Sequence, residues 1–209
     1  MVLDVHVLGT ASARPTPDRA VSGSLVKGPN GTVVVDCGEG FQTRFAMQRR
    51  RLKRFSVGET LKPSSIDALV FTHGHLDHTW GALPWLQSMD LENRQQPLLV
   101  LGPTSSEAID ALLNQRPMPE RVSPADLARQ WTAWFTLGGD TIRFPIRWVL
   151  GDVAADRWIE MEPSTNEATL LDGMPQPEGW KNSTLRPVPT EHSVPSCGWL
   201  IQQDAKAGK

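Results

Sequence analysis

The chain lacks several features that would place it in a specialised class of protein. It has no tyrosine and only two cysteines, Cys37 and Cys197, which are too few for a framework of several disulfides and fit a reducing cytosol. Asp4 and His6 interrupt the first apolar residues before a signal-peptide core can form, and no run approaches the ~18 apolar residues of a membrane span. These absences predict a cytoplasmic protein with no membrane partner.

The chain also lacks an excess of charge of either sign. Its 21 Lys and Arg residues nearly balance 23 Asp and Glu residues, for a net charge of −2. A nucleic acid or another anion would therefore have to be bound by a local patch. A hydrophobic content of 39% with 17 glycines is ordinary for a globular protein and excludes intrinsic disorder, and 209 residues suit one domain.

Short runs typical of β-strands outnumber helical patterns. Strands are expected over residues 2–8, 24–27, 32–36, 68–72, 98–101, 141–145, 185–189 and 198–202, and hairpin strands with loops over 152–181. Helices are expected over 41–55, 77–89, 105–114 and 123–134, the last capped by Ser123 before Pro124. Strands interleaved with helices predict a layered α/β fold.

The most informative segment follows the apolar run at 68–71 and contains His73, His75, Asp77 and His78. Side chains two residues apart in an extended chain share a face, so His73 and His75 can bind one metal ion. Asp77 and His78 open a helix and aim at a second point a few ångströms away. Imidazole and carboxylate suit Zn²⁺, with Mn²⁺ or Fe as alternatives. If the segment binds no metal, it is a surface loop that happens to be rich in histidine.

This His-x-His-x-Asp-His pattern after a hydrophobic strand resembles the signature of the metallo-β-lactamase superfamily, whose fold is an αββα sandwich. Three further segments, at 8–16, 35–42 and 192–199, resemble the ribonuclease Z family of tRNA 3′-processing endoribonucleases, in the order of that family. Phe41 stands where that family usually has Thr, and Trp199 stands in place of the common Tyr. The resemblance spans residues 3 to about 202.

The resemblance implies a role for each matched residue. His192 joins His73 and His75 on a first metal, while Asp77 and His78 serve a second. Asp77 also handles the proton of the attacking water. Asp36 resembles the family's buried carboxylate that orients a ligand imidazole, although an Asp that caps the Gly38 turn is an equal alternative.

The resemblance also implies a bridging Asp in a Gly-Asp-Thr segment and a further His, both after the position of His192. After Leu200 only Asp204 is acidic, and no His follows. Asp140 in Gly139-Asp140-Thr141 precedes His192, so we interpret it, like Asp152 after Gly151, as a turn residue. We therefore expect residues 1–209 to form one metallo-β-lactamase-like domain that is incomplete in its second half, without the C-terminal completion and the tRNA-binding arm.

Two groups of residues are candidates for contact with RNA. Trp80 and Trp85 could stack a base, although packing in the core is the alternative. A basic stripe could meet phosphates, although a solvated helix face is equally compatible with it. The stripe consists of Arg44, Arg49, Arg50, Arg51, Lys53 and Arg54.

The function implied by the resemblance is removal of 3′ trailers from precursor tRNA, by attack of a metal-bound hydroxide on a phosphodiester, with two Zn²⁺ in a complete site. The first alternative is another phosphodiesterase or hydrolase of the same fold, because this fold hosts many hydrolyses. The second is a catalytically incomplete fragment that only binds metal. Expected partners are precursor tRNA and either a second copy of the chain or a completing polypeptide.

Overall fold

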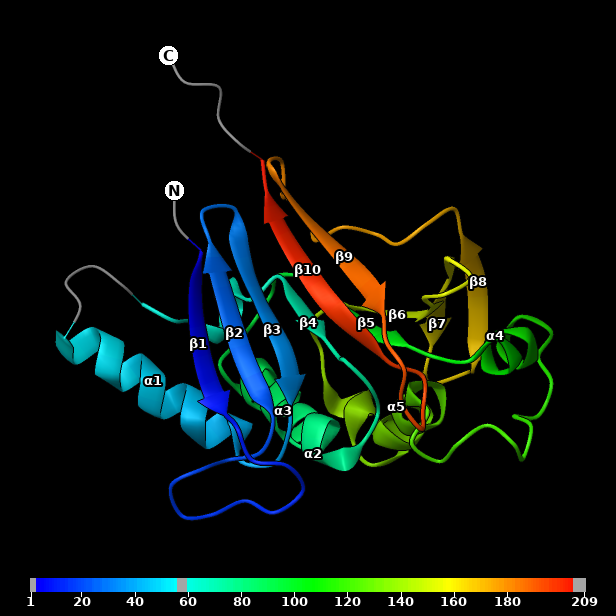
Figure 1. Ribbon diagram of the computed structural model, residues 1–209, viewed down its shortest axis with the longest axis horizontal. Coiled ribbons are helices and arrows are strands. Elements are labelled where there is room, and N and C mark those ends of the chain that lie inside the picture. The colour runs from blue at the N-terminus through cyan, green and yellow to red at the C-terminus, as the bar shows by residue number, and fades with distance from the viewer. Residues whose placement is uncertain (1–2, 56–59, 205–209) are drawn as a thin grey trace.

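An eight-stranded mixed β-sheet forms the centre of the computed structural model, which describes residues 3–55 and 60–204 (Figure 1). The strands lie in the sheet in their order along the chain. The inner strands β3 to β6 are parallel, and both ends of the sheet are antiparallel. The strands are β1 (Asp4–Gly9), β2 (Gly23–Gly28), β3 (Gly31–Cys37), β4 (Ala68–Val70), β5 (Leu98–Pro103), β6 (Ile146–Asp152), β7 (Arg157–Glu162) and β8 (Glu167–Leu171).

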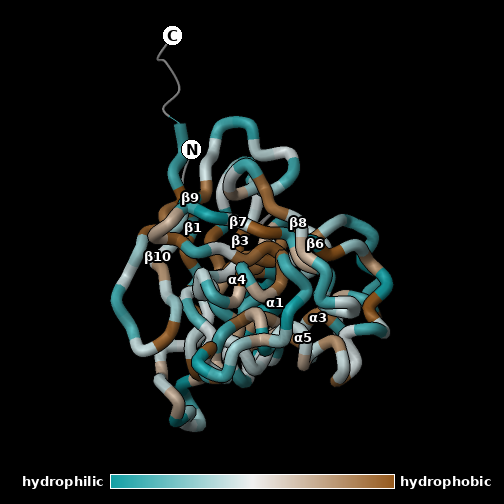
Figure 2. The backbone as a smooth tube through the Cα atoms, turned by 90° about the vertical axis from the view of Figure 1, so that its right-hand side faces the viewer, coloured by the Kyte–Doolittle hydropathy of each residue, from teal (hydrophilic) through white to brown (hydrophobic). Residues whose placement is uncertain are grey.

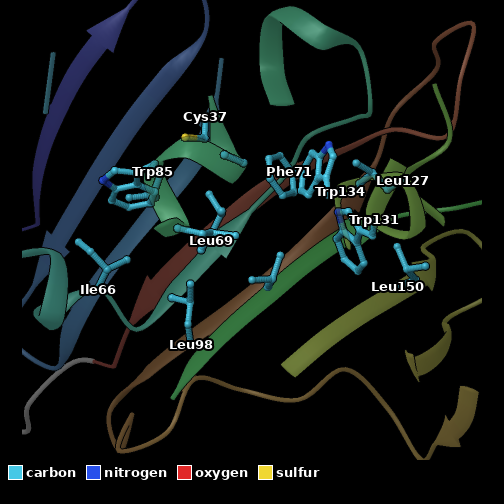
Figure 3. Close-up of a cluster of buried hydrophobic side chains, with 14 of the residues drawn as sticks. Cys37, Ile66, Leu69, Phe71, Trp85, Leu98, Leu127, Trp131, Trp134 and Leu150 are labelled. Carbon is cyan, nitrogen blue, oxygen red and sulfur yellow. The ribbon is translucent and has the colours of Figure 1, made fainter. Parts of the chain in front are cut away.

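Helices cover one face of this sheet and enclose the larger hydrophobic core. The helices are α1 (Phe41–Phe55), α2 (Leu76–Thr79), α3 (Ala82–Leu91), α4 (Ser106–Leu113) and α5 (Leu127–Thr136), with 3-10 turns η1 (Pro63–Ser65) and η2 (Gly139–Thr141). Phe71 meets Trp134 edge to face with 5.8 Å between ring centroids, and Leu69 and Leu98 belong to the same cluster of buried side chains (Figure 3). Burial of these large side chains dominates the stability of the layer.

A two-stranded sheet covers the middle of the opposite face. It consists of β9 (Ser183–Pro189) and β10 (Cys197–Gln203), which cross in front of the central strands (Figure 1). Leu185 packs there with Val70, Leu101 and Trp158 in a second hydrophobic cluster. Hydrophobic stretches gather at the strands in the interior, and much of the outer chain is hydrophilic (Figure 2). The layered α/β architecture expected from the sequence is confirmed.

Three expected elements differ from the structure. The strand at 141–145 is wrong: this segment is η2 and irregular backbone, and β6 starts only at Ile146. The backbone N–H of Arg143 donates to the Asp90 carboxylate instead of to a neighbouring strand. The single helix at 77–89 is broken into α2 and α3.

The third difference concerns the start of α5. The helix is capped by Asp126, not Ser123, and Asp126 also accepts hydrogen bonds from Thr104 and Ser105. Residues 1–2 of the first expected strand and residues 205–209, next to which the arm was expected, lie outside the described residues. Among the residues that the structure describes, no helix is long and apolar enough to cross a membrane.

Candidate metal centre

The histidine-rich segment lies in the connection between β4 and α2, at the edge of the sheet where the parallel strands end. This is the lower edge in Figure 1, where the loop between β1 and β2 and the loop between β9 and β10 also arrive. Gly74 lets the segment pass close to its neighbours, because a Cβ there would lie 1.9 Å from the carbonyl oxygen of Ala125. The chain then turns into α2, whose first turn carries Asp77 and whose last turn carries His78.

Asp36 links this segment to the end of β3. Its carboxylate is 3% exposed and accepts hydrogen bonds from the backbone N–H of Thr72 at 2.8 Å and from the Ser22 hydroxyl at 3.1 Å. Its Oδ2 lies 2.7 Å from Nδ1 of His78. The N–H of Gly38 donates to Ser22 instead of to Asp36, so Asp36 does not act as the cap of that turn. Asp36 therefore fixes the orientation of the His78 ring.

The segment with His192 reaches the site through the start of β10. The N–H of Cys197 donates to the carbonyl of Thr72 at 2.8 Å, and the Trp199 indole N–H donates to the carbonyl of Phe71 at 2.9 Å. These bonds tie β10 to the end of β4. The loop that precedes β10 is thereby held beside His73, which forms a β-bridge with Ser196.

His73, His75 and His192 form a cluster that fits a metal ion. Their candidate ligand nitrogens all lie within 4.8 Å of one another, and Nε2 of His192 is 3.2 Å from Nδ1 of His75. Nitrogens that bind one tetrahedral Zn²⁺ at roughly 2.0–2.1 Å lie about 3.3 Å apart, so small side-chain rotations close the site. The donor set and its spacing therefore fit a divalent cation.

The surroundings of two of the histidines shift their pKa values in opposite directions. Burial, followed by the neighbouring His78, lowers the pKa of His73 to about 4, so its imidazole is neutral and keeps a lone pair at neutral pH. Burial also acts to lower the pKa of His78, but the hydrogen bond to Asp36 and the charges of Asp36 and Asp77 outweigh it and raise that pKa. The Asp36 carboxylate favours a proton on Nδ1 of His78, which leaves Nε2 for a metal.

Asp77 and His78 lie beside the cluster and mark a second position. Nε2 of His78 is 3.7 Å from Oδ2 of Asp77, and the rings of His73 and His78 are 4.0 Å apart. Asp77 also lines a cavity of about 610 Å³ together with His75. All five residues expected at the metal centre thus lie at one edge of the sheet, and their role as ligands is addressed below.

The two aspartates interpreted as turn residues lie outside the histidine cluster. Asp140 belongs to the turn η2, which follows the left-handed Gly138 and packs on α5. Asp152 ends β6 and accepts hydrogen bonds from the backbone N–H groups of Ala154 and Ala155, as a turn residue does. It also lines a cavity of about 590 Å³ shared with His192.

The expected basic stripe runs along α1, which begins at the edge of the metal centre and leads away from it (Figure 1). Arg44, near the start, donates to the carbonyl of Pro17 in the loop between β1 and β2. Arg49 pairs with Glu92 at 3.4 Å, and Arg54 lies over the Phe55 ring. The far end of the stripe is thus distant from the histidines, and its contact with RNA stays a prediction.

The structure separates the two candidate tryptophans and adds two residues that the sequence did not single out. Trp85 is 2% exposed and packs against Phe41, whereas Trp80 is 53% exposed. The missed residues are Thr72, whose hydroxyl lies within 3.1 Å of both the Asp36 carboxylate and Nδ1 of His73, and Ser22. The position of Thr72 directly before the histidine motif was the available signal, and Ser22 had none.

Comparisons with known proteins agree with this geometry. Residues 16–91, which contain four of the five residues of the candidate centre, match the model of the Metallo-beta-lactamase superfamily. The metallo-β-lactamase fold protein YhfI from Bacillus subtilis superimposes with a TM-score of 0.52 at 15% identity, over 96% of this chain and 57% of that protein. The chain therefore has the metallo-β-lactamase fold.

The relatives found by sequence comparison point to one family within this fold. The chain is 34% identical over 108 residues to ribonuclease Z from Myxococcus xanthus and 33% identical over 140 residues to ribonuclease Z from Agathobacter rectalis. The matches cover 52% and 66% of this chain but only 31% and 42% of those relatives. The resemblance to ribonuclease Z is thus confirmed, and the matched regions span well under half the length of these relatives.

Proposed function

We propose that the chain is part of a metal-dependent endoribonuclease that removes 3′ trailers from precursor tRNA in the cytoplasm. The observation that carries this proposal is the convergence of His73 and His75 with His192, which lies more than a hundred residues further along the chain. The similarity to ribonuclease Z supports RNA as the substrate. A hydrolytic centre alone would not select it, because one fold hosts many hydrolyses.

Zinc is the cation that the donor set suits best, with Mn²⁺ or Fe as alternatives. His73, His75 and His192 would hold a first ion, and Asp77 with His78 would contribute to a second. When bound, such a pair of cations lowers the pKa of water and neutralises the charge that develops on a phosphoryl group.

The protein's own groups then supply positioning and proton transfer. Asp77 is placed to accept the proton of the attacking water, because its carboxylate faces both the histidines and the adjoining cavity. Asp36 holds His78 through Nδ1 so that Nε2 faces Asp77. Thr72, which donates to Asp36, keeps that carboxylate in place.

Among residues 3–55 and 60–204, His73, His75 and His192 form the one group of three or more candidate metal ligands, so Asp77 and His78 would need further ligands to hold a second ion. We propose that further ligands come from a second copy of the chain or from a completing polypeptide. Zinc content after purification tests this point. Fewer than one tightly held zinc ion per chain would contradict catalysis by two metals in the isolated chain.

A cleavage assay tests the proposed reaction. A 5′-labelled precursor tRNA transcript with a 3′ trailer is incubated with the protein and zinc or manganese, beside a chromogenic phosphodiester. We expect a single product that ends near the trailer junction, and no product with His73→Ala. Turnover of the small ester without cleavage of the transcript would instead identify another phosphodiesterase of the same fold.

A further inference from the structure

Trp80 stands apart from the other tryptophans of the chain. All eight tryptophans lie in the described part of the chain. Trp80 is the only one of them that is clearly exposed, at 53%. By contrast, Trp85, Trp131 and Trp158 are at most 2% exposed. An indole gains most of its stabilising energy from burial, so an exposed one on a rigid element requires an explanation.

The backbone holds Trp80 firmly in this exposed position. Its N–H donates to the carbonyl of Leu76 at 2.9 Å, which closes the turn of α2. The next residue, Gly81, donates to the carbonyl of Cys37 at 2.8 Å and approaches β3 so closely that a Cβ would lie 2.1 Å from the carbonyl oxygen of Gly38. Trp80 is therefore fixed between the metal centre and the end of β3.

The indole lines the cavity of about 610 Å³ that also contains His75 and Asp77. The other walls include Ser12, Val21 and Glu39, and no lysine or arginine from residues 3–55 or 60–204 contributes to them. A phosphate would be repelled from the carboxylates of Glu39 and Asp77 unless a cation were present. An uncharged planar group is therefore favoured beside Trp80, while a phosphodiester is favoured at the metal end.

We propose that Trp80 is a stacking platform for one nucleobase of the single-stranded RNA that enters the metal centre. Every base presents a π-face, so such a platform positions a strand without selecting its sequence. This inference rests on the proposed function, because it takes RNA as the substrate. Trp80 is a positioning residue in this scheme: it holds the strand while other groups act on the phosphodiester.

Binding of labelled single strands to the protein in the presence of Zn²⁺ tests the platform through affinity and does not depend on cleavage. The probes are a fluorescein-labelled deoxyadenosine strand of about 12 nucleotides, within the site sizes of single-strand-binding proteins, and an abasic strand of equal length. Fluorescence anisotropy gives each Kd. The variants are Trp80→Ala, Trp80→Phe and the matched control Phe55→Ala, which removes a 70% exposed ring at the end of α1.

We expect Trp80→Ala to weaken binding of the base-containing strand roughly 5- to 150-fold, the range for loss of one stacked base. Trp80→Phe and Phe55→Ala should retain wild-type affinity to within a factor of about three, because one keeps an aromatic face and the other leaves the cavity intact. Binding of the abasic strand should not change in any variant. If Trp80→Ala does not fold, Trp80→Leu replaces it.

Three results would overturn the inference. They are wild-type affinity in Trp80→Ala, equal weakening of both strands, and a wild-type Kd weaker than about 1 mM, below ordinary non-specific binding. Failure of the proposed function has a different signature. The wild-type protein would then leave precursor tRNA uncut, while binding of the base-containing strand would still depend on Trp80.

Discussion

Replacing Asp36 with Asn should change the proton position on His78 while the fold is preserved. The Asn side-chain oxygen can still accept from the N–H of Thr72, as Oδ1 of Asp36 does. Its amide NH₂ then occupies the place of Oδ2, 2.7 Å from Nδ1 of His78. Two donors cannot face each other, so the imidazole proton moves to Nε2, and the lone pair needed beside Asp77 is lost.

The magnitude follows from the bonds that are exchanged. A hydrogen bond to a charged group contributes about 1.5–3 kcal/mol and a neutral one about 1 kcal/mol, so Asp36→Asn should lower the free energy of unfolding by about 0.5–2 kcal/mol. The φ of 59° at Asp36 adds no further cost, because Asn adopts the left-handed region readily. Zinc affinity should fall about 10- to 100-fold, as it does when a metal-binding histidine loses its orienting partner.

Nitrogen-15 NMR of the imidazole rings reads this change directly. Wild-type His78 should carry its proton on Nδ1, and the variant should carry it on Nε2, while a competition titration measures zinc affinity. Asp36→Ala serves as the disruptive control, since it leaves the buried N–H of Thr72 without its partner. A variant in which Nε2 of His78 stays unprotonated and zinc binds with wild-type affinity would refute the reasoning.

Three further predictions concern other parts of the molecule. His192→Ala should reduce zinc affinity more than ~100-fold, which is the upper cost of losing only an orienting partner. Isothermal titration calorimetry measures this affinity, and an unchanged value would show that His192 is not a ligand. The hydrogen bonds from Arg143 lower the pKa of Asp90 below its ordinary 3.8, so this pair stabilises the fold above pH 3.8 and the contribution is lost as the pH falls through the lowered value. Chemical denaturation should therefore show Asp90→Asn less stable than wild type at neutral pH, with a gap that shrinks in acid; a constant gap would contradict the assignment. Val5 and Val7 are each 60% exposed on the face of β1 away from α1, so we expect the protein to associate as its concentration rises. The double variant Val5→Thr with Val7→Thr should reduce this association in sedimentation velocity. A wild-type protein that stays monomeric at every concentration would count against the prediction.

Much of the fold was accessible from the sequence because local patterns coincide with it. The helix at 41–55 has the bounds expected from the spacing of Phe41, Phe45, Leu52 and Phe55. The first three side chains are buried, whereas Phe55 is 70% exposed. The helix expected over 77–89 breaks at Gly81 because that residue packs on the backbone of β3. Such a contact joins residues 44 apart in the chain, and no local pattern reports it.

The same distinction applies to the metal centre. The motif around His73 indicated a metal site by residue type and spacing alone, and the likeness to ribonuclease Z pointed to His192. The bonds that bring them together, from Cys197 and Trp199 to the end of β4, depend on the packing of β10 over the sheet. The sequence also left Trp80 and Trp85 equivalent, and only the burial of one and the exposure of the other separates them.

The central claim is that His73, His75 and His192 form one metal centre. Anomalous diffraction at the zinc absorption edge, on crystals grown with zinc, tests it most directly. The account predicts a peak between the three imidazoles, with nitrogens at roughly 2.0–2.1 Å. A zinc-replete crystal with no peak at these histidines, or with zinc bound only elsewhere, would contradict it.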